Sequence, residues 1–361
     1  MKDSSKKILT ILAATVALVI ALTLLPQAIG AWFLNSATAR IVRAAALPQD
    51  SPERASLLNQ ADAELRQAQS FSQLPRLALA RARYLLAINA APRAVNAFVE
   101  SGVVLSTDAV AQFDWANAAW QSNQTQVAFE HWRAAGAQVY FTQQMHRAAI
   151  AHLWNDAENY ARIAVGIDPS NADAHFFLGD ALSHKSIDDA EAMNEIDRAA
   201  GLTRDPEFLS TVLSRKGEIL AAQGKLTLAL DIFQQARQVA PMDARPRTDY
   251  ALNLVKLDPT RYTESMDLLQ HVVGDSPWYT AAYIGLADLF EARGDVRAAE
   301  QWYKSGLAKN PNDGGLLFAL GKFYARQHRA DEAKTTLTQA LKKETHWDDL
   351  QAIAHALAET Q

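Results

Sequence analysis

Apolar residues recur at helical spacing along most of the chain. From residue 283 to 311 they return every three or four positions, with a break at Gly294-Asp295 and an end at Pro311. That spacing predicts two short amphipathic helices joined as a hairpin. A hairpin of this kind cannot bury its apolar stripe alone, so it needs similar neighbours. The inner faces are expected to carry Tyr283, Leu286, Phe290, Ala299, Tyr303 and Leu307.

Regularly spaced prolines indicate where those neighbours lie. Successive intervals between them are 37, 35, 36 and 34 residues. Proline cannot continue a helix, so a proline at each repeat predicts a periodic end to the second helix of each pair. The prolines are Pro169, Pro206, Pro241, Pro277 and Pro311.

This pattern resembles the tetratricopeptide repeat, a unit of about 34 residues that carries W-x2-L-G-x2-Y, A-x3-F and a final proline. One unit matches it with Leu213, Gly217, Leu220, Gly224, Ala229, Phe233, Ala236 and Pro241. The hairpin from residue 283 matches, as does the next unit, with Leu317, Leu320, Gly321, Tyr324, Ala333, Leu337 and Ala340. Two units have longer turns, one of them near Pro259. The resemblance covers residues 172–345 well and 107–171 more weakly.

The resemblance implies an all-α fold, an α-solenoid of tetratricopeptide hairpins. Residues 107–345 are predicted to form that solenoid, and 35–106 a helical region of degenerate repeats that begins the stack. Residues 346–361 are predicted to form a capping helix. Its inner face would hold Leu350, Ile353, Ala354 and Leu357, with polar residues outward, as the end of a solenoid requires.

The N-terminus combines a basic segment with a long apolar run. Lys2, Lys6 and Lys7 precede Ile8–Leu25, which holds no charged residue, and apolar character continues to Leu34. That length suits a membrane-spanning helix. We therefore predict a single transmembrane helix over residues 8–34, residues 1–7 in the cytoplasm and the repeats outside it. A cleaved signal peptide is the alternative, although its apolar core is normally shorter.

Composition and motifs give no sign of an enzyme. The chain has 361 residues, a net charge of -5 and no cysteine, which excludes disulfides and cysteine-based metal or nucleophile sites. None of the nine histidines forms a metal-binding motif, and phosphate-loop and nucleophile-elbow patterns are absent. Neither charge nor basic clustering favours nucleic acid. We expect no catalytic residue, metal, cofactor or small-molecule substrate.

The resemblance also implies where a partner would bind. In this family the first helix of each pair lines the concave surface, which takes an extended or helical peptide. Transferred to this chain, the groove would be acidic in its middle and basic toward its C-terminal end. Its expected residues are Phe176, Asp180, His184, Ser214, Glu218, Ala221, Leu252, Val255, Ile284, Asp288, Glu291, Phe318, Lys322 and Arg326.

Two functions remain open from the sequence. One is a membrane-anchored scaffold or adaptor that binds proteins transiently during assembly or quality control of envelope or membrane complexes. The other is a permanent structural subunit of a larger membrane complex. An exposed apolar patch on the convex side or in residues 35–106 would favour the permanent subunit.

Overall fold

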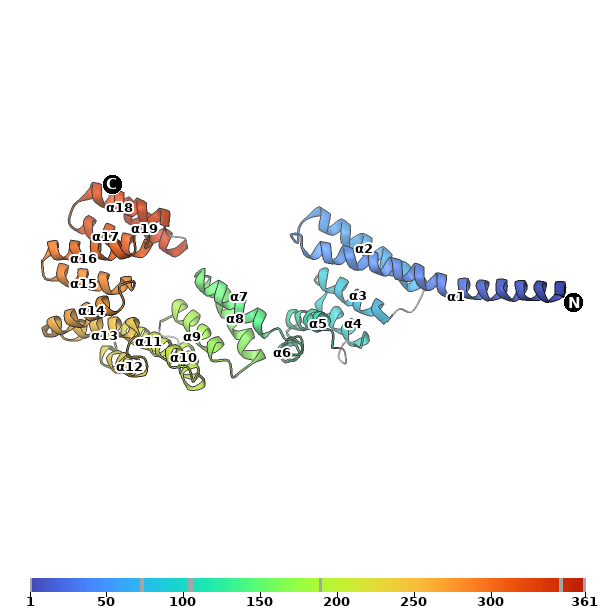
Figure 1. The fold of residues 1–361 in the computed structure, drawn as a ribbon, viewed down its shortest axis with the longest axis horizontal. Coiled ribbons are helices and arrows are strands. Elements are labelled where there is room, and N and C mark those ends of the chain that lie inside the picture. Colours follow the sequence, from blue (N-terminus) through green and yellow to red (C-terminus); the bar gives the residue numbers. More distant parts are fainter. Residues whose placement is uncertain (1, 72–74, 103–106, 188–189, 344–346, 360–361) are drawn as a thin grey trace. The chain divides into compact units, whose positions relative to one another are not determined.

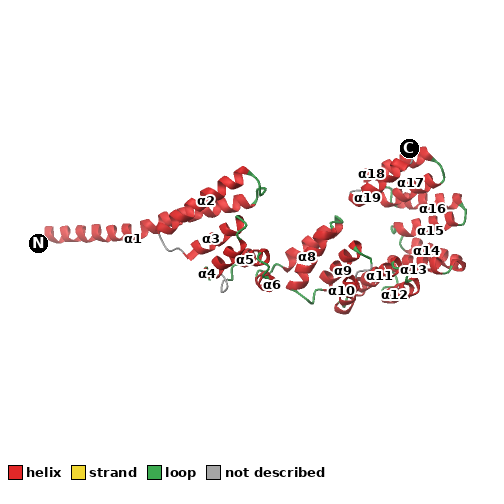
Figure 2. Ribbon diagram, turned by 180° about the vertical axis from the view of Figure 1, so that it is seen from behind, coloured by secondary structure: helices red, strands yellow, loops and turns green. Residues whose placement is uncertain are grey.

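Every regular element in the described part of the chain is a helix (Figures 1 and 2). The computed structural model describes residues 2–71, 75–102, 107–187, 190–343 and 347–359, with the backbone alone for residues 2–23, 75 and 347–350. The chain divides into two compact units, 1–139 and 140–361. The all-α solenoid predicted from the repeats is confirmed.

The first unit consists of one very long helix and the hairpins that follow it. The first helix continues through Pro26 without a break. Helices of the later hairpins contact their neighbours in sequence order, and helix α4 also contacts α5. The helices are α1 (Lys2–Ala45), α2 (Pro52–Phe71), α3 (Pro75–Ala87), α4 (Ala91–Glu100), α5 (Ala109–Gln121) and α6 (Thr125–Ala134).

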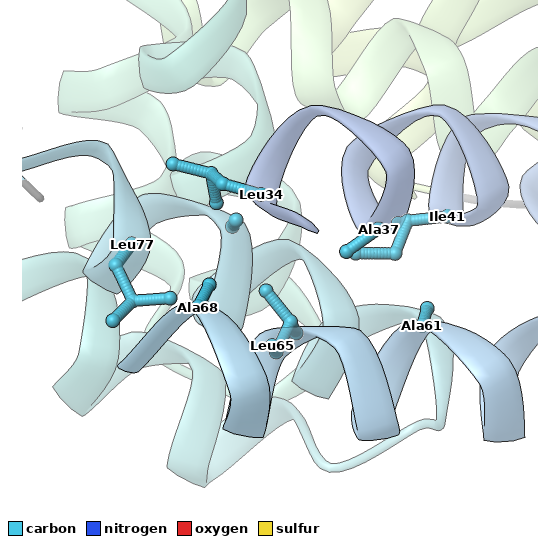
Figure 3. Packing of buried hydrophobic residues seen from close by; sticks show 8 residues of the cluster. Leu34, Ala37, Ile41, Ala61, Leu65, Ala68 and Leu77 are labelled. Carbon is cyan, nitrogen blue, oxygen red and sulfur yellow. The ribbon is translucent and has the colours of Figure 1, made fainter. Parts of the chain in front are cut away.

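The second half of α1 belongs to the core of this unit. Leu34, Ala37 and Ile41 are buried against α2 and α3 (Figure 3). Ion pairs reinforce this contact, since Arg40 of α1 lies 3.0 Å from a carboxylate oxygen of Glu64 on α2. Residues 35–45 therefore act as the first helix of the first hairpin.

The predicted membrane span falls largely on residues whose side chains lie outside the described part. Residues 2–23 are helical in backbone and continuous with the rest of α1. Among the side chains that are described, no helix combines the length and apolarity needed to cross a membrane.

The second unit is a series of helix pairs. Its helices are α7 (Gln138–Ile150), α8 (Trp154–Ile167), α9 (Ala172–Lys185), α10 (Ala190–Leu202), α11 (Pro206–Ala222), α12 (Leu226–Val239), α13 (Ala244–Leu257), α14 (Tyr262–Asp275), α15 (Thr280–Ala292), α16 (Val296–Lys309), α17 (Gly314–Arg326), α18 (Ala330–Lys343) and α19 (Trp347–Glu359). The longer turn predicted near Pro259 is a short 3-10 helix, Pro259–Arg261.

Prolines and polar caps set the helix ends. Four of the five periodic prolines lie two residues beyond the ends of α8, α12, α14 and α16, as predicted. The fifth, Pro206, was predicted to stop a helix but is the first residue of α11, a position that tolerates proline because its N–H needs no partner. At the start of four first helices, an N-cap side chain accepts hydrogen bonds from backbone N–H groups of the first turn. These caps are Asn171, Asp205, Asp243 and Asp313.

Small residues let paired helices approach closely. A Cβ on Gly217 would lie 2.4 Å from the ring of Phe233, and one on Gly321 would lie 2.6 Å from Leu337. Ala287 and Ala299 are fully buried between α15 and α16, where the sequence predicted a close contact. The repeat glycines and alanines are therefore contact residues.

The C-terminal helix packs as a cap on one side. Ile353 of α19 is buried against Leu317 and Leu337, and Leu357 is partly buried there. Ala354, predicted on the inner face, is exposed because it lies one residue further around the helix. Leu350 lies outside the described side chains.

Candidate partner-binding surface

The first helices of the second unit lie next to one another. Helix α11 contacts α9 and α13, α13 also contacts α15, and α15 contacts α17. Among the described residues, no comparable contact joins two consecutive second helices. In a curved stack, neighbouring elements approach most closely on the inner side, so α9, α11, α13, α15 and α17 form what we call the inner surface.

Charged side chains that were predicted to face a partner form ion pairs between consecutive first helices. Asp180 of α9 accepts an ion pair from Arg215 of α11, with Nε and Oδ1 2.6 Å apart. Arg215 also lies 3.0 Å from Glu218, whose other oxygen lies 3.2 Å from Nε of Arg245 on α13. We call Asp180, Arg215, Glu218 and Arg245 the ion-pair ladder. It neutralises much of the acidic character expected in the middle of the surface.

A second charge contact joins α15 to α17. Glu291 lies 2.6 Å from Nη2 of Arg326 and accepts a 3.0 Å hydrogen bond from Gln327. The hydrogen bond from Arg326 is the main reason that the pKa of Glu291 lies below its usual value. The acidic middle and basic end predicted from the sequence are thus partners of each other.

The predicted apolar positions are mostly covered. Phe176 is buried, packing edge-on against Phe208 and Phe177, so it is not available to a partner. Ile284 and Phe318 are half-buried at the edges of core clusters.

The remaining predicted positions differ in how freely they are exposed. Lys322 is exposed, with Nζ 5.3 Å from the centre of the Phe318 ring. Asp288 is exposed but accepts a 2.6 Å hydrogen bond from the hydroxyl of Tyr303, which is buried. His184 stacks on Trp154 with ring centres 3.7 Å apart. Ser214 is fully buried, Ala221 is half-buried, and Leu252 and Val255 are half-buried on α13.

Sequence reasoning missed the most unusual group on this surface, Asp249 of α13. Its Oδ2 atom is buried and has no hydrogen-bond partner in the described part of the chain. Burial and the nearby negative charge of Glu218 raise the pKa of Asp249 to about 7, although Arg245 opposes the rise. Burial also raises the pKa of Tyr279 above its usual value, with Asp249 adding to the effect. Asp249 is therefore poised to exchange a proton near neutral pH.

Helix α13 carries further unused hydrogen-bonding capacity. Buried side-chain oxygens of Thr248 and Asn253 have no partner among the described residues. Buried polar atoms are normally paired, so three such side chains on one helix mark a site that needs an explanation. A ligand that supplies donors is one such explanation.

Histidines and carboxylates are the side chains of this surface that could serve as metal ligands. Among the described residues, no group of three or more histidine or carboxylate side chains is placed to hold a metal ion. His175 is buried; it bonds Glu195, and its Nε2 lies 3.0 Å from the carbonyl oxygen of Pro169. This pair joins α9 to α10.

A signal for two of these ion pairs did exist in the sequence. Asp180 and Arg215 are 35 residues apart, as are Glu291 and Arg326, which is one repeat length in each case. Opposite charges at equivalent positions of consecutive repeats predict an ion pair between first helices. Nothing comparable indicated Asp249, whose state depends on burial.

Comparison with known proteins agrees with this geometry. The profile of the tetratricopeptide repeat family matches residues 256–317 and 292–358. These residues are tetratricopeptide repeats. A tetratricopeptide repeat protein from Parabacteroides merdae superposes with a TM-score of 0.51 at 16% identity, over 75% of this chain and 97% of that one. At that identity the likeness shows the fold alone.

Two sequence relatives are much longer proteins. Cellulose synthase 1 operon protein C of Komagataeibacter xylinus is 30% identical over 137 residues, 35% of this chain and 10% of its own length. Cellulose synthase operon protein C of Xanthomonas axonopodis is 29% identical over 217 residues, 52% of this chain and 13% of its own length. The chain described here thus spans only a small part of either relative.

Proposed function

We propose that this chain is a non-catalytic scaffold that binds a segment of a protein partner on its inner surface, around α13. The observation that carries the proposal is the combination on one helix of unpartnered polar atoms and half-buried apolar side chains. Asp249 supplies hydrogen-bonding capacity, and Leu252 and Val255 supply apolar surface; Thr248 and Asn253 lie beneath them and are buried. Few polar groups set among apolar ones are typical of recognition sites.

The charge pattern favours one type of segment. The ladder and the Glu291–Arg326 pair are already neutralised, whereas Asp249 lacks a bonded partner for Oδ2. An extended peptide with N–H donors, or a basic side chain directed at Asp249, would satisfy these acceptors. Binding of such a segment would lower the pKa of Asp249, because a donor or cation favours the carboxylate.

Charge reversal at Asp288 and Glu291 would be a poor test. Each of them holds a structural partner, the buried Tyr303 hydroxyl and Arg326 respectively. A loss of binding would then be confounded by a loss of folding.

Val255→Lys is a cleaner test, matched by Leu228→Lys on the second helix α12. Val255 is half-buried on the inner surface, whereas Leu228 is 54% exposed on a helix that is not part of it. We expect Val255→Lys to lower recovery of partners co-purified with the full chain by about tenfold, the loss of one good apolar contact. Equal recovery with both variants would rule out this site.

We include membrane attachment in the proposal. Its support is the uncharged run from Ile8 to Leu25 and the continuity of α1 from Lys2 into the first unit. Leu34, at the end of the predicted span, already packs in the core of that unit. An anchor here would join the repeats without a flexible linker and keep them close to the bilayer.

Two measurements test the attachment and its orientation. Resistance to alkaline extraction from native membranes is expected of a spanning helix, while release into the supernatant would exclude it. Protease added from outside the cytoplasm should digest the repeats, whereas protection of the repeats would reverse the proposed orientation.

A permanent subunit is the second candidate, and one observation favours it. Trp32 is 63% exposed and Phe71 is exposed on α1 and α2, and both rings contact Phe33, with centres 4.9 and 6.0 Å away. Exposed aromatic groups of this kind mark docking surfaces. The relatives named for cellulose synthase operons make a polysaccharide-synthase complex one such setting. After mild-detergent purification, proteins that co-elute in stoichiometric amounts would support the permanent subunit. Proteins that co-elute in substoichiometric amounts and dissociate in salt would support the transient scaffold.

A further inference from the structure

The first unit contains a basic pocket that is separate from the inner surface proposed to bind partners. It has a volume of about 360 Å³ and is lined by α2, α3 and α4. Each helix contributes one arginine, Arg66, Arg81 and Arg93. Leu65 lines the pocket and is also part of the buried core shown in Figure 3.

Two of these arginines have no partner within the described part of the chain. Arg66 lies 2.8 Å from Asp62 one turn earlier on α2. Arg81 and Arg93 form no hydrogen bond or ion pair with any residue that the structure describes. The contrast with Arg83 on the same helix is informative, because Arg83 lies 2.6 Å from Asp114 of α5. The α3 arginine that reaches α5 thus has a carboxylate partner, and Arg81, which lines the pocket, has none among the described residues.

Neutral donors complete the lining. Tyr84 and Asn96 also line the pocket, and neither side chain forms a hydrogen bond with a described residue. Burial raises the pKa of Tyr84, so its hydroxyl keeps its proton and can donate. The arginines of α2 and α4 act on the same hydroxyl, which places it within reach of their charges.

We propose that this pocket binds a phosphate group carried by a small ligand or a lipid headgroup. Arginine presents planar N–H pairs that match phosphate oxygens. Arg81, Arg93 and Tyr84 approach from two helices, and three such donor groups suit the three terminal oxygens of a phosphate monoester better than the two of a carboxylate. The lining holds three arginines against Asp62 and Glu100, so one positive charge is in excess.

Glu100 gives the site a distinctive prediction. It lines the pocket and forms no ion pair with a described residue, so it repels a bound phosphate. Glu100→Gln is expected to strengthen phosphate binding several-fold. If the arginines are only solvated charges that bind no phosphate, Glu100→Gln should not change phosphate binding.

The test is calorimetric titration of the full chain in mild detergent with glycerol 3-phosphate, at constant ionic strength. Arg81→Gln and Arg93→Gln should each weaken binding by about tenfold, the loss of one charge-assisted hydrogen bond. Arg76→Gln is the matched control, an exposed α3 arginine outside the pocket, and should bind like the parent. Melting curves should be unchanged in all three, because none of these side chains has a hydrogen-bond or ion-pair partner among the described residues.

Two comparisons identify the ligand. Malonate should bind more weakly than glycerol 3-phosphate, and equal binding would overturn the assignment to phosphate. Phosphatidic acid vesicles are compared with phosphatidylcholine vesicles, which report insertion of α1 alone. If the chain binds the acidic vesicles more strongly and Arg81→Gln abolishes the difference, the phosphate belongs to a lipid headgroup. If the chain binds glycerol 3-phosphate but shows no extra binding to the acidic vesicles, the phosphate belongs to a soluble ligand. Failure to bind the ester, or weakening by Arg76→Gln as large as by Arg81→Gln, overturns the proposal.

Discussion

Arg215 of α11 lies with its Nε 2.6 Å from Oδ1 of Asp180, one helix pair earlier in the chain. Both side chains are only 15% exposed. The same guanidinium donates to Ser183, also on α9, over 2.8 Å. Arg215 therefore connects two repeats through several charge-assisted bonds in a partly buried setting, where such bonds are stronger than on the open surface.

Replacing Arg215 by methionine should destabilise the second unit. The change leaves the carboxylates of Asp180 and Glu218 without their shared cation, and we expect the free energy of unfolding to fall by about 2 kcal/mol. Arg261→Met is the control, because its pair with Glu264 is exposed and should contribute much less. Urea unfolding measures both, and equal effects would show that the ladder contributes no more than a surface pair.

The helix pairs could be predicted because they depend on local sequence. Spacing placed Leu286, Ala299 and Tyr303 in the core, and all three are buried. Periodic prolines gave most helix ends, since proline acts within its own turn. Pro206 differs because Asp205 before it is an N-cap, so the proline is the first residue of a helix and does not follow the end of one.

The inner surface was less predictable because it depends on which side chains pair across repeats. Asp180, Glu218 and Glu291 were read as free charges, and all three are in ion pairs. Phe176 was read as a groove residue and is buried. Helical spacing places a residue on a face but does not say what the adjacent helix brings to it.

Gly217→Ala should destabilise the repeat even though alanine favours helices. Its Cβ would lie 2.4 Å from the ring of Phe233, which is fully buried and cannot move aside cheaply. We expect a loss of about 1–3 kcal/mol from overpacking. Thermal unfolding of the variant provides the measurement.

Gly274→Ala is the matched change for Gly217→Ala. Gly274 also lies in a helix, α14, but a Cβ there has open space around it. This variant should gain about 0.5–1 kcal/mol from helix propensity. Destabilisation by both substitutions would show that close approach to Phe233 is not the cause.

Glu300 should stabilise the C-terminal repeats at neutral pH and lose that effect in acid. Hydrogen bonds from Arg329, and further ones from Lys304 and Tyr324, lower its pKa to about 2. Because the folded pKa lies below the unfolded value, the contribution is complete above about pH 4.5 and disappears as the pH falls toward 2. Glu300→Gln should thus cost about 1 kcal/mol at pH 7 and much less at pH 2.5, measured by urea unfolding. A cost independent of pH would contradict the ionic origin.

Asp249 should have the opposite pH dependence. Its folded pKa is raised to about 7, mainly by burial, so the folded state binds a proton more tightly than the unfolded chain does. Stability therefore falls as the pH rises from about 4 to 7, and the cost of the charged form is complete above 7.

Asp249→Asn removes the charge that burial penalises while keeping the shape of the side chain. It should raise the free energy of unfolding at pH 8 by about 2 kcal/mol and change it little at pH 4. Urea unfolding at both pH values measures the difference. If Asp249 serves a partner, the same variant should bind that partner more weakly while folding more stably. A variant that lost stability at pH 8 would mean that Arg245 holds Asp249 as a structural ion pair, and the site on α13 would lose its free acceptor.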